Sequence, residues 1–315
     1  MASFTIIIPV LNEGSRLTAN LLEILSRARQ LEKHNWKLVV VDDGSSDDSV
    51  QAIVAAREQA PEIDLICFTR RFGKESAIHA GLLHCRDIDA AIVMDSDLQH
   101  PPQLIAELVR AWESGAKVVN AIKVRRGKET HTRNLLTRLY FALFKRFTRL
   151  DIKGDTDFKL LDQEVIRAYR RFPESERFFR GLVRWMHFHS RDVEFDVPEQ
   201  SGAAKSSWSN PALLRYALSS ITSFTALPLQ IVTLLGGLSL IIAVVFGSIA
   251  LFDKITGNAV DGFTTVILLI LLLGSILMIS VGLIGTYIGK IYDEVKRRPS
   301  YFIDYQKSSI DDDNK

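Results

Sequence analysis

Two kinds of hydrophobic pattern alternate along the N-terminal part of the chain. Short apolar runs rich in isoleucine and valine lie at 4–10, 37–43, 63–69, 89–95 and 116–122. Between them lie segments with apolar residues at helical spacing, such as 17–31 and 101–112. Short continuous apolar runs are typical of strands buried on both faces, as in a parallel sheet. The repeated strand–helix–strand order therefore predicts a doubly wound α/β domain.

The pattern changes near Pro228, where two long apolar stretches without charged residues begin. They cover 229–252 and 263–288, and each exceeds the roughly 20 residues that a helix needs to span a bilayer. A buried helical hairpin in a soluble core is the alternative. It is disfavoured, because two adjacent uncharged runs of this length rarely fit inside a domain of this size. We expect two transmembrane helices.

Basic residues flank these stretches unevenly. Lys205 and Arg215 precede the first stretch, and Lys254 lies in the loop between the two. The second stretch is followed by a basic cluster of Lys290, Lys296, Arg297 and Arg298. Cytoplasmic flanks of membrane spans carry an excess of Lys and Arg. We therefore expect an integral protein of the inner or plasma membrane, with both termini in the cytoplasm.

These patterns divide the chain into four parts. The expected boundaries are 1–205 for a cytoplasmic catalytic domain, 206–227 for a juxtamembrane amphipathic helix, 228–289 for the transmembrane hairpin and 290–315 for a cytoplasmic tail. The first residues lack a basic segment, and a proline interrupts their short apolar run, so they do not resemble a signal peptide.

Composition excludes little. Lys and Arg together number 39 and Asp and Glu 37, which leaves a formal net charge of +2. This balance does not single out an acidic or a basic partner. Cys67 and Cys85 are the two cysteines, and we expect buried free thiols there. No Cys/His spacing of the kind that binds metals is present.

Polar residues gather where three of the predicted strands end. These residues are Pro9, Asn12 and Glu13, then Asp42 and Asp43, then Asp95, Asp97 and Gln99. Doubly wound sheets bind ligands beyond the carboxyl ends of their strands. The stretch DDGSSDDS is also compatible with a simple turn and helix cap. Several carboxylates at one sheet edge are harder to explain this way, because like charges repel unless a cation lies among them.

The pair Asp95 and Asp97 is the strongest candidate for a metal site. In an extended chain, residues i and i+2 point to the same side, so both carboxylates can converge, with Gln99 close by. A few oxygen ligands with room left over suit Mg²⁺ or Mn²⁺ that is shared with the phosphates of a substrate. Pro101 and Pro102 suit the start of the following helix, where a missing N–H is harmless.

Four stretches form a recognisable series of motifs, namely IIIPVLNE, VVVDDGSSDDS, RRFGKESAIHAGL and VMDSDLQHPP. In this order they resemble glycosyltransferase family 2, which has the GT-A fold. GDTDFKLLD, SERFFRGLVRW, the two apolar stretches and IGKIYDEVKRRPSY resemble one branch, the polyisoprenyl-phosphate glycosyltransferases. This branch includes bactoprenol glucosyltransferases and dolichyl-phosphate mannose synthases. The resemblance implies a Rossmann-like GT-A domain that binds a nucleotide sugar, followed by interfacial helices and two transmembrane helices.

The resemblance also implies roles for individual residues. The donor nucleotide would contact Pro9, Leu11, Glu13, Asp42, Asp43, Lys74, Asp95 and Ser96. Asp95, Asp97 and Gln99 would hold Mg²⁺ or Mn²⁺ on the diphosphate, and Asp97 and Asp157 are the catalytic candidates. Asp157 would orient the acceptor or act as a base. A helix cap, or a salt bridge with Lys159 or a nearby arginine, is the structural alternative for Asp157.

The sequence departs from the family pattern in two places. Leu11 replaces the usual Tyr or Phe, so aromatic stacking is absent there. Glu199 or Gln200 stands where an arginine is usual, and Lys205 is the candidate to replace that phosphate contact. The histidines are expected to be structural, and of them only His100 lies beside the predicted site.

The segment 123–149 is basic and amphipathic. It contains nine Lys or Arg and one Glu, interleaved with apolar residues at helical spacing. Such a helix suits the headgroup region of a membrane, where each basic residue contributes about 1 kcal/mol. A plain solvated helix is the alternative interpretation of this segment. Nucleic-acid binding is disfavoured by the adjoining apolar stretches. Arg125, Arg126 and Arg133 are the candidates for a donor or acceptor phosphate.

The predicted function is an inverting sugar transfer from a nucleoside-diphosphate sugar to a polyprenyl phosphate. Undecaprenyl phosphate is favoured over dolichyl phosphate, because the two-span form resembles bacterial members. The product would serve glycan or lipid modification of the cell envelope. The resemblance also implies a homo-oligomer, specifically a tetramer, and no nucleic-acid partner is expected.

Two other functions remain as alternatives. A processive polysaccharide synthase usually has more spans and the motif QxxRW, but Gly181 stands where its glutamine would be. A membrane scaffold with an inactive transferase domain is the non-enzyme alternative. The presence of Asp43, Asp95 and Asp97 argues against it.

Overall fold

The computed structural model describes residues 1–123, 142, 144–152, 154–174, 177–195, 225, 227–256 and 262–310. The chain forms two compact units. One unit combines Met1–Ser207 with Arg298–Lys315, and the other is Trp208–Arg297. Residues from the two ends of the sequence therefore belong to one folded unit.

The first unit is built on a mixed sheet of seven strands within the described residues. Their bounds are β1 (Ala2–Val10), β2 (His34–Asp42), β3 (Ile63–Cys67), β4 (Ala90–Val93), β5 (Val118–Lys123), β6 (Asp155–Asp162) and β7 (Ser190–Phe195). Their order across the sheet is β3-β2-β1-β4-β6-β5-β7. β1 to β4 run parallel to one another, as their apolar runs predicted. The five strands expected from the sequence are all present.

The antiparallel strand β6 and the edge strand β7 were not predicted. β6 pairs with both β4 and β5 in antiparallel register. Asp155, Asp157 and Lys159 alternate along β6, which breaks the continuous apolar run that marked the other strands. Most residues of β7 are exposed or half-buried and only Phe195 is buried, so its sequence lacks the continuous apolar run that marked the other strands.

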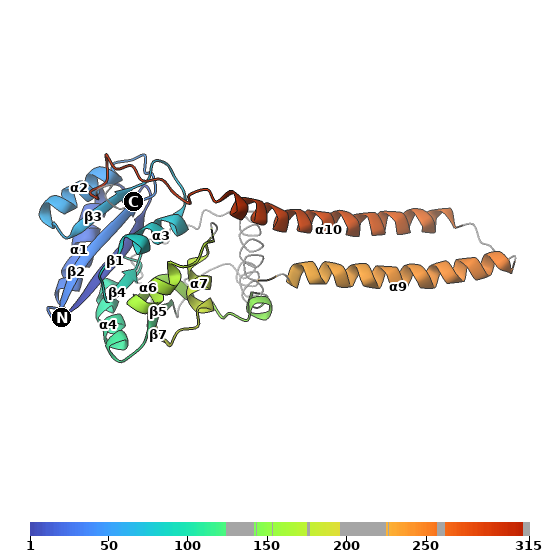
Figure 1. Ribbon diagram of the computed structural model, residues 1–315, viewed down its shortest axis with the longest axis horizontal. Coiled ribbons are helices and arrows are strands. Elements are labelled where there is room, and N and C mark those ends of the chain that lie inside the picture. The colour runs from blue at the N-terminus through green and yellow to red at the C-terminus, as the bar shows by residue number, and fades with distance from the viewer. Residues whose placement is uncertain are drawn as a thin grey trace. The chain divides into compact units, whose positions relative to one another are not determined.

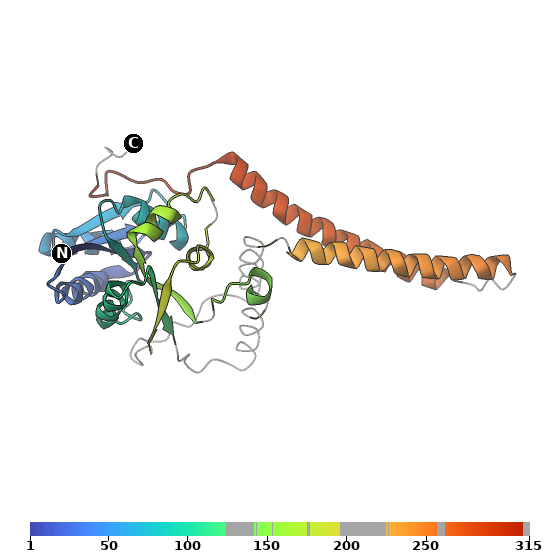
Figure 2. The ribbon, with the colours of Figure 1, turned by 60° about the horizontal axis from the view of Figure 1, so that its bottom comes forward.

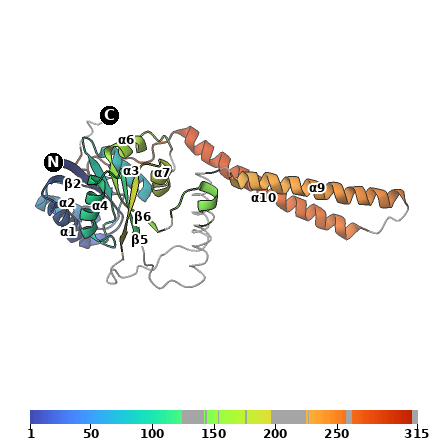
Figure 3. The same ribbon diagram turned by 90° about the horizontal axis from the view of Figure 1, so that it is seen from below.

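Helices cover both faces of the sheet (Figure 1). They are α1 (Leu17–Arg29), α2 (Ser49–Gln59), α3 (Lys74–His84), α4 (Ile105–Glu113), α6 (Gln163–Tyr169) and α7 (Phe179–Trp185), with short 3-10 turns at Gly14–Arg16 and Pro102–Leu104. Figure 3 shows α1, α2 and α4 on one side of the strands and α3, α6 and α7 on the other. The main core lies on the first side, where Ile6 and Ile8 of β1 pack with Leu21 and Ile24 of α1.

Strand register brings the polar strand ends together. Val10 at the end of β1 lies opposite Asp42 of β2, and Ile7 lies opposite Val93 of β4. Lys159 of the antiparallel β6 also lies opposite Val93. The N-terminal half of β6, which contains Asp157, therefore extends past the end of β4 on the edge where the parallel strands end.

The segment after the second unit returns to the first one. Phe68 and Ile303 form an antiparallel bridge, and the Thr69 N–H donates to the carbonyl of Phe302 at 3.0 Å. Figure 2 shows this dark red segment beside the sheet. Both cysteines of the first unit are buried free thiols, as expected.

The second unit contains α9 (Leu227–Ile255) and α10 (Phe263–Lys296). Both helices are long and apolar enough to cross a membrane, over Val232–Ile249 and Leu272–Lys296. Large apolar side chains such as Leu240 and Met278 are exposed along them, at 66% and 68%. The predicted spans thus coincide with the two helices, whereas nearly all of the predicted juxtamembrane helix lies outside the described residues.

Candidate active site

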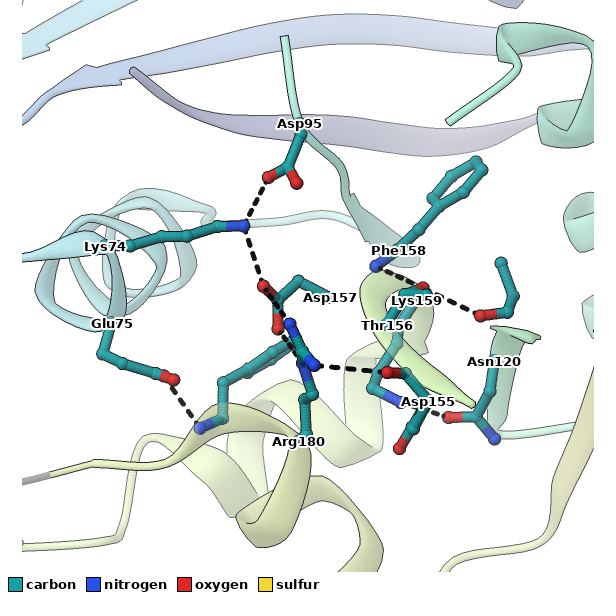
Figure 4. A network of polar contacts seen from close by, with 12 residues as sticks. Lys74, Glu75, Asp95, Asn120, Asp155, Thr156, Asp157, Phe158, Lys159 and Arg180 are labelled. Carbon is teal, nitrogen blue, oxygen red and sulfur yellow. Dashed lines mark hydrogen bonds and ion pairs between the residues drawn. The ribbon is translucent and has the colours of Figure 1, made fainter. Parts of the chain in front are cut away.

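Lys74 links two carboxylates at the carboxyl end of the parallel strands (Figure 4). Its Nζ lies 2.6 Å from Oδ1 of Asp95 and 2.8 Å from Oδ2 of Asp157. Lys74 is the first residue of α3, Asp95 follows β4, and Asp157 lies in β6. Burial alone would lower the pKa of Lys74, but the charges of Asp95 and Asp157 raise it above its usual range. Lys74 is therefore a fixed cation between two strand ends.

Asp157 is held from the other side by Arg180 of α7. The guanidinium donates twice, from Nε to Oδ1 at 2.6 Å and from Nη2 to Oδ2 at 3.0 Å. Burial by itself would raise the pKa of Asp157, but Arg180 and Lys74 outweigh burial and hold this pKa far below its usual range. Asp157 is thus ionised at neutral pH, and its partners match the salt-bridge alternative with a nearby arginine.

A second charged network lies beside the first on the same face of β6. Asp155 pairs with Lys159, whose Nζ also donates to Oδ1 of Asn120 at 2.7 Å. Arg184, one helical turn after Arg180, contacts Asp155 at 3.2 Å. Lys159 is fully buried, and a buried charge requires partners of this kind. The alternation of charges along β6 thus anchors α7 to the sheet.

Glu75 supports the same helix from α3. Its Oε2 accepts a hydrogen bond from the backbone N–H of Phe179 at 2.8 Å. Figure 4 shows Glu75 with this bond as a dashed line. Burial, followed by the nearby negative charge of Asp157, raises the pKa of Glu75 to about 7, although Arg180 and Lys74 act in the opposite direction. Glu75 therefore titrates near neutral pH.

The segment after β4 is shaped by local hydrogen bonds. The Asp95 N–H donates to Nδ1 of His100 at 3.3 Å, and the His100 ring stacks on Phe158 with centroids 5.1 Å apart. Oδ1 of Asp97 accepts from the Gln99 N–H at 3.0 Å. His100 thus supports the backbone of Asp95, consistent with a structural role.

Negative charge accumulates beside Lys74. The pKa of Glu13 is raised, first by burial and then by Asp97 and Asp95, while a hydrogen bond from Ser96 acts against the shift. Asp97 is exposed. Glu13 follows β1, and Asp95 and Asp97 follow β4, and carboxylates are hard oxygen ligands of the type that Mg²⁺ and Mn²⁺ accept. Among the described residues, no three His, Cys, Asp or Glu side chains are already grouped as a metal site.

The two aspartates after β2 have different partners. Asp42 accepts hydrogen bonds from the backbone N–H and the hydroxyl of Ser45. These bonds form a turn, as the stretch DDGSSDDS allowed. Asp43 instead accepts from the N–H groups of Phe72 and Gly73, at 2.6 and 2.9 Å. Burial raises the pKa of Asp43, and these amides oppose the shift. Asp43 thus holds the loop that leads into α3 and Lys74.

Gly44 allows the loop before α3 to lie close to the backbone that follows β2. Its φ is +75°, and a Cβ atom added to it would lie 2.5 Å from the carbonyl carbon of Arg70. Both the left-handed backbone and the close contact exclude a side chain at this position. On the neighbouring strand end, Oδ1 of Asn12 accepts from the Ser46 N–H at 2.9 Å, which ties the first polar strand end to the second.

The remaining predicted residues divide into two groups. Pro9 is buried in β1, and Leu11 and Gln99 follow β1 and β4 at the same sheet edge. The predicted phosphate-binding residues lie outside the described residues, and so does most of the basic segment; they are Arg125, Arg126, Arg133 and Lys205.

Sequence reasoning missed Arg180 and Glu75 as parts of the site. A signal was present for the arginine, since Arg180 and Arg184 are four residues apart in SERFFRGLVRW and so lie on one helix face. The alternation of Asp155, Asp157 and Lys159 likewise indicated a charged strand face. No sequence feature indicated that these two patterns face each other.

Comparisons with known proteins identify the family of the chain. The family model described as "Glycosyl transferase family 2" matches residues 5–178. An uncharacterized glycosyltransferase from Synechocystis is 35% identical over 305 residues, which cover 95% of this chain and 94% of that protein. A prophage bactoprenol glucosyl transferase homolog from Escherichia coli is 32% identical over 301 residues, covering 95% of this chain and 97% of that protein.

The chain is also similar to a solved structure, glucosyl-3-phosphoglycerate synthase from Mycobacterium tuberculosis in complex with UDP. The identity is 18% and the TM-score 0.49, with coverage of 70% of this chain and 79% of that one. The family match and the near full-length relatives identify the GT-A-like mixed sheet as that of a transferase. The chain belongs to glycosyl transferase family 2.

Proposed function

We propose that the chain transfers a sugar from a nucleoside-diphosphate sugar to a polyprenyl phosphate at the cytoplasmic face of the membrane. The observation that carries this proposal is the position of Lys74 between Asp95 and Asp157 at the ligand-binding edge of the sheet. The two long apolar helices and the relatives named bactoprenol glucosyl transferase support a lipid acceptor. Undecaprenyl phosphate is the favoured acceptor.

The chemistry requires little proton transfer. A phosphate monoester has its second pKa near 6 and is largely dianionic at neutral pH, so the acceptor is already a nucleophile. Direct attack on the anomeric carbon inverts its configuration and expels the nucleoside diphosphate. Asp157 is ionised and bound by two cations, which makes it a weak base. Its role in this proposal is to position Lys74 and Arg180.

Negative charge that develops on the departing diphosphate needs stabilisation. Lys74 supplies one positive charge at the sheet edge. Asp95 and Asp97, with Gln99, would hold Mg²⁺ or Mn²⁺, and a bound divalent cation neutralises phosphate oxygens. The oxygen donors of Asp95, Asp97 and Gln99, which follow β4 at the carboxyl end of the parallel strands, are the chemistry that fits such a cation.

The acceptor must reach this edge from a membrane. Residues before α9 and residues after α10 belong to the same folded unit. A chain that leaves the cytoplasm through α9 must therefore return through α10, which supports a hairpin with both termini on one side. Arg125, Arg126, Arg133 and Lys205 remain the proposed contacts to phosphate, and a homotetramer remains the proposed assembly.

One assay tests the proposal against its alternatives. Membranes containing the chain are incubated with labelled nucleotide sugars and undecaprenyl phosphate, with Mg²⁺, with Mn²⁺ or with a chelator. Metal-dependent label in a lipid that carries one sugar supports the proposal. A long polymer would indicate a processive synthase. Absence of turnover with every donor would favour the inactive scaffold.

A further inference from the structure

The segment 298–310, which follows α10, pairs with the outer edge of the sheet. The Asp304 N–H donates to the carbonyl of Cys67 at 2.8 Å, and the Cys67 N–H donates to the hydroxyl of Ser308 at 2.8 Å. Leu65 donates its N–H to the hydroxyl of Ser309 at 2.7 Å. The segment thus occupies the free edge of β3, where unpaired backbone groups would otherwise face solvent.

Side chains of the segment reach the loop that follows β3. The ring of Tyr301 stacks on Phe68 at 4.9 Å and 15° between planes. Phe68 meets Phe72 edge to face at 5.7 Å, and Phe302 lies 6.1 Å from Phe72. A set of four aromatic rings therefore connects the C-terminal segment to residue 72.

Residue 72 belongs to the donor side of the site. The N–H groups of Phe72 and Gly73 bind the carboxylate of Asp43, and the next residue is Lys74, which pairs with Asp95 and Asp157. The loop is thus attached at one end to Asp43 and at the other to the charged network. Its remaining side is covered by Tyr301 and Phe302.

Two further contacts connect the segment to the site. Tyr301 lies against His79 of α3, with centroids 6.2 Å apart, and α3 begins at Lys74. The hydroxyl of Ser300 lies 3.3 Å from Nη1 of Arg177, which precedes the helix that carries Arg180. The segment therefore touches the loop, the helix after it and the approach to α7.

We propose that residues 298–310 act as a clamp that positions the donor site, with Tyr301 as its central positioning residue. The clamp fixes the loop 69–73 so that its amides bind Asp43 and Lys74 meets both carboxylates. It follows α10 directly, so the donor site of the full chain is tied to its second apolar helix. This inference rests on the proposed function only for the identity of the ligand.

The experiment uses the full-length chain in detergent and three variants. Tyr301→Ala removes the stacked ring, Tyr301→Phe keeps it, and Tyr292→Ala removes an exposed aromatic ring of α10, outside the clamp. Binding of UDP, GDP and dTDP is measured by calorimetry with Mn²⁺ present. Amide hydrogen exchange of Phe72 and Gly73 is compared with that of β1.

Loss of one aromatic pair should weaken nucleotide binding about five- to tenfold in Tyr301→Ala. Tyr301→Phe and Tyr292→Ala should stay within about twofold of the wild type. Exchange at Phe72 and Gly73 should accelerate in Tyr301→Ala while β1 exchanges as before. If Tyr301→Ala does not fold, Phe302→Ala replaces it, because Phe302 is 55% exposed.

The outcomes separate the clamp from the proposed function. Unchanged exchange at Phe72 and Gly73 overturns the clamp, and so does faster exchange throughout β1, which indicates general destabilisation. A Tyr301→Ala variant that binds nucleotide like the wild type also overturns it. A wild-type chain that binds no nucleoside diphosphate and transfers no sugar overturns the proposed function, and the exchange result then decides the clamp alone.

Discussion

Arg180 donates two hydrogen bonds to the carboxylate of Asp157, at 2.6 and 3.0 Å, while Nζ of Lys74 lies 2.8 Å from the same carboxylate. Asp157 thus lies between a cation from α7 and a cation from α3. Bidentate arginine–carboxylate pairs are geometrically specific as well as strong. The pair fixes the side chain of Asp157, and through it the position of Lys74 beside Asp95.

Arg180→Lys should lower sugar transfer because a lysine cannot donate twice in one plane. We expect kcat to fall about ten- to a hundredfold, the cost of losing a well-placed charged contact. Steady-state kinetics measure this loss, with the donor sugar that the transfer assay identifies. Arg167→Lys serves as the control, since Arg167 lies on α6 and pairs with Gln163. Equal kinetics in the wild type and Arg180→Lys would show that the paired geometry is dispensable.

Asp97→Asn should abolish transfer while the protein stays folded. Asp97 is exposed, and the hydrogen bond that it accepts from the Gln99 N–H can also be accepted by the Asn carbonyl. The free energy of unfolding should therefore change by less than about 0.5 kcal/mol. The variant is assayed for transfer and for its thermal midpoint, beside Asp48→Asn as a charge-matched control. Wild-type activity in Asp97→Asn would remove the metal assignment.

Glu75→Gln should change how stability depends on pH. The pKa of Glu75 in the folded chain is raised to about 7 by burial, so the protonated form is favoured on folding. The stability from this group is fully present below its unfolded pKa near 4.5 and is lost as pH rises through 7. Glu75 is only half-buried in the structure, so solvent screening reduces the loss to about 2 kcal/mol.

Thermal midpoints of the full chain at pH 5 and pH 8 measure this effect. The wild type should lose stability between the two values, and Glu75→Gln should lose less, because a glutamine still accepts from the Phe179 N–H and does not ionise. Glu164→Gln, on the exposed side of α6, is the control. Parallel pH curves for the wild type and Glu75→Gln would contradict the raised pKa.

Gly44→Ala should destabilise the catalytic unit and weaken donor binding. The left-handed φ of Gly44 costs an alanine about 1 kcal/mol or more, and its Cβ would lie 2.5 Å from the Arg70 carbonyl carbon. The loop must move away, which breaks the bonds between Asp43 and the amides of Phe72 and Gly73. Gly115→Ala separates these effects, because Gly115 also has a positive φ but no atom within 4 Å of an added Cβ. Equal losses in the two variants would indicate backbone strain alone.

The sequence by itself determined the parallel half of the sheet, the two apolar helices and the strand ends that carry Glu13, Asp43 and Asp95. Strands that are buried on both faces need continuous apolar runs, and helices that span a membrane need long uncharged runs. Both elements can therefore be predicted from the local order of apolar and polar residues. The carboxyl ends of parallel strands lie together at one end of the sheet, so the strand pattern alone predicts that these carboxylates lie close to one another.

Only the tertiary structure decided the partners of these carboxylates. Asp157 contacts Lys74 and Arg180, which are distant from it in sequence. These contacts form because β6 joins the sheet antiparallel to β4 and α7 packs on β6. Tyr301 meets Phe68 across more than two hundred residues because the chain returns after α10 to an open strand edge. Such contacts depend on strand order and direction, which local patterns of hydrophobic and polar residues do not encode.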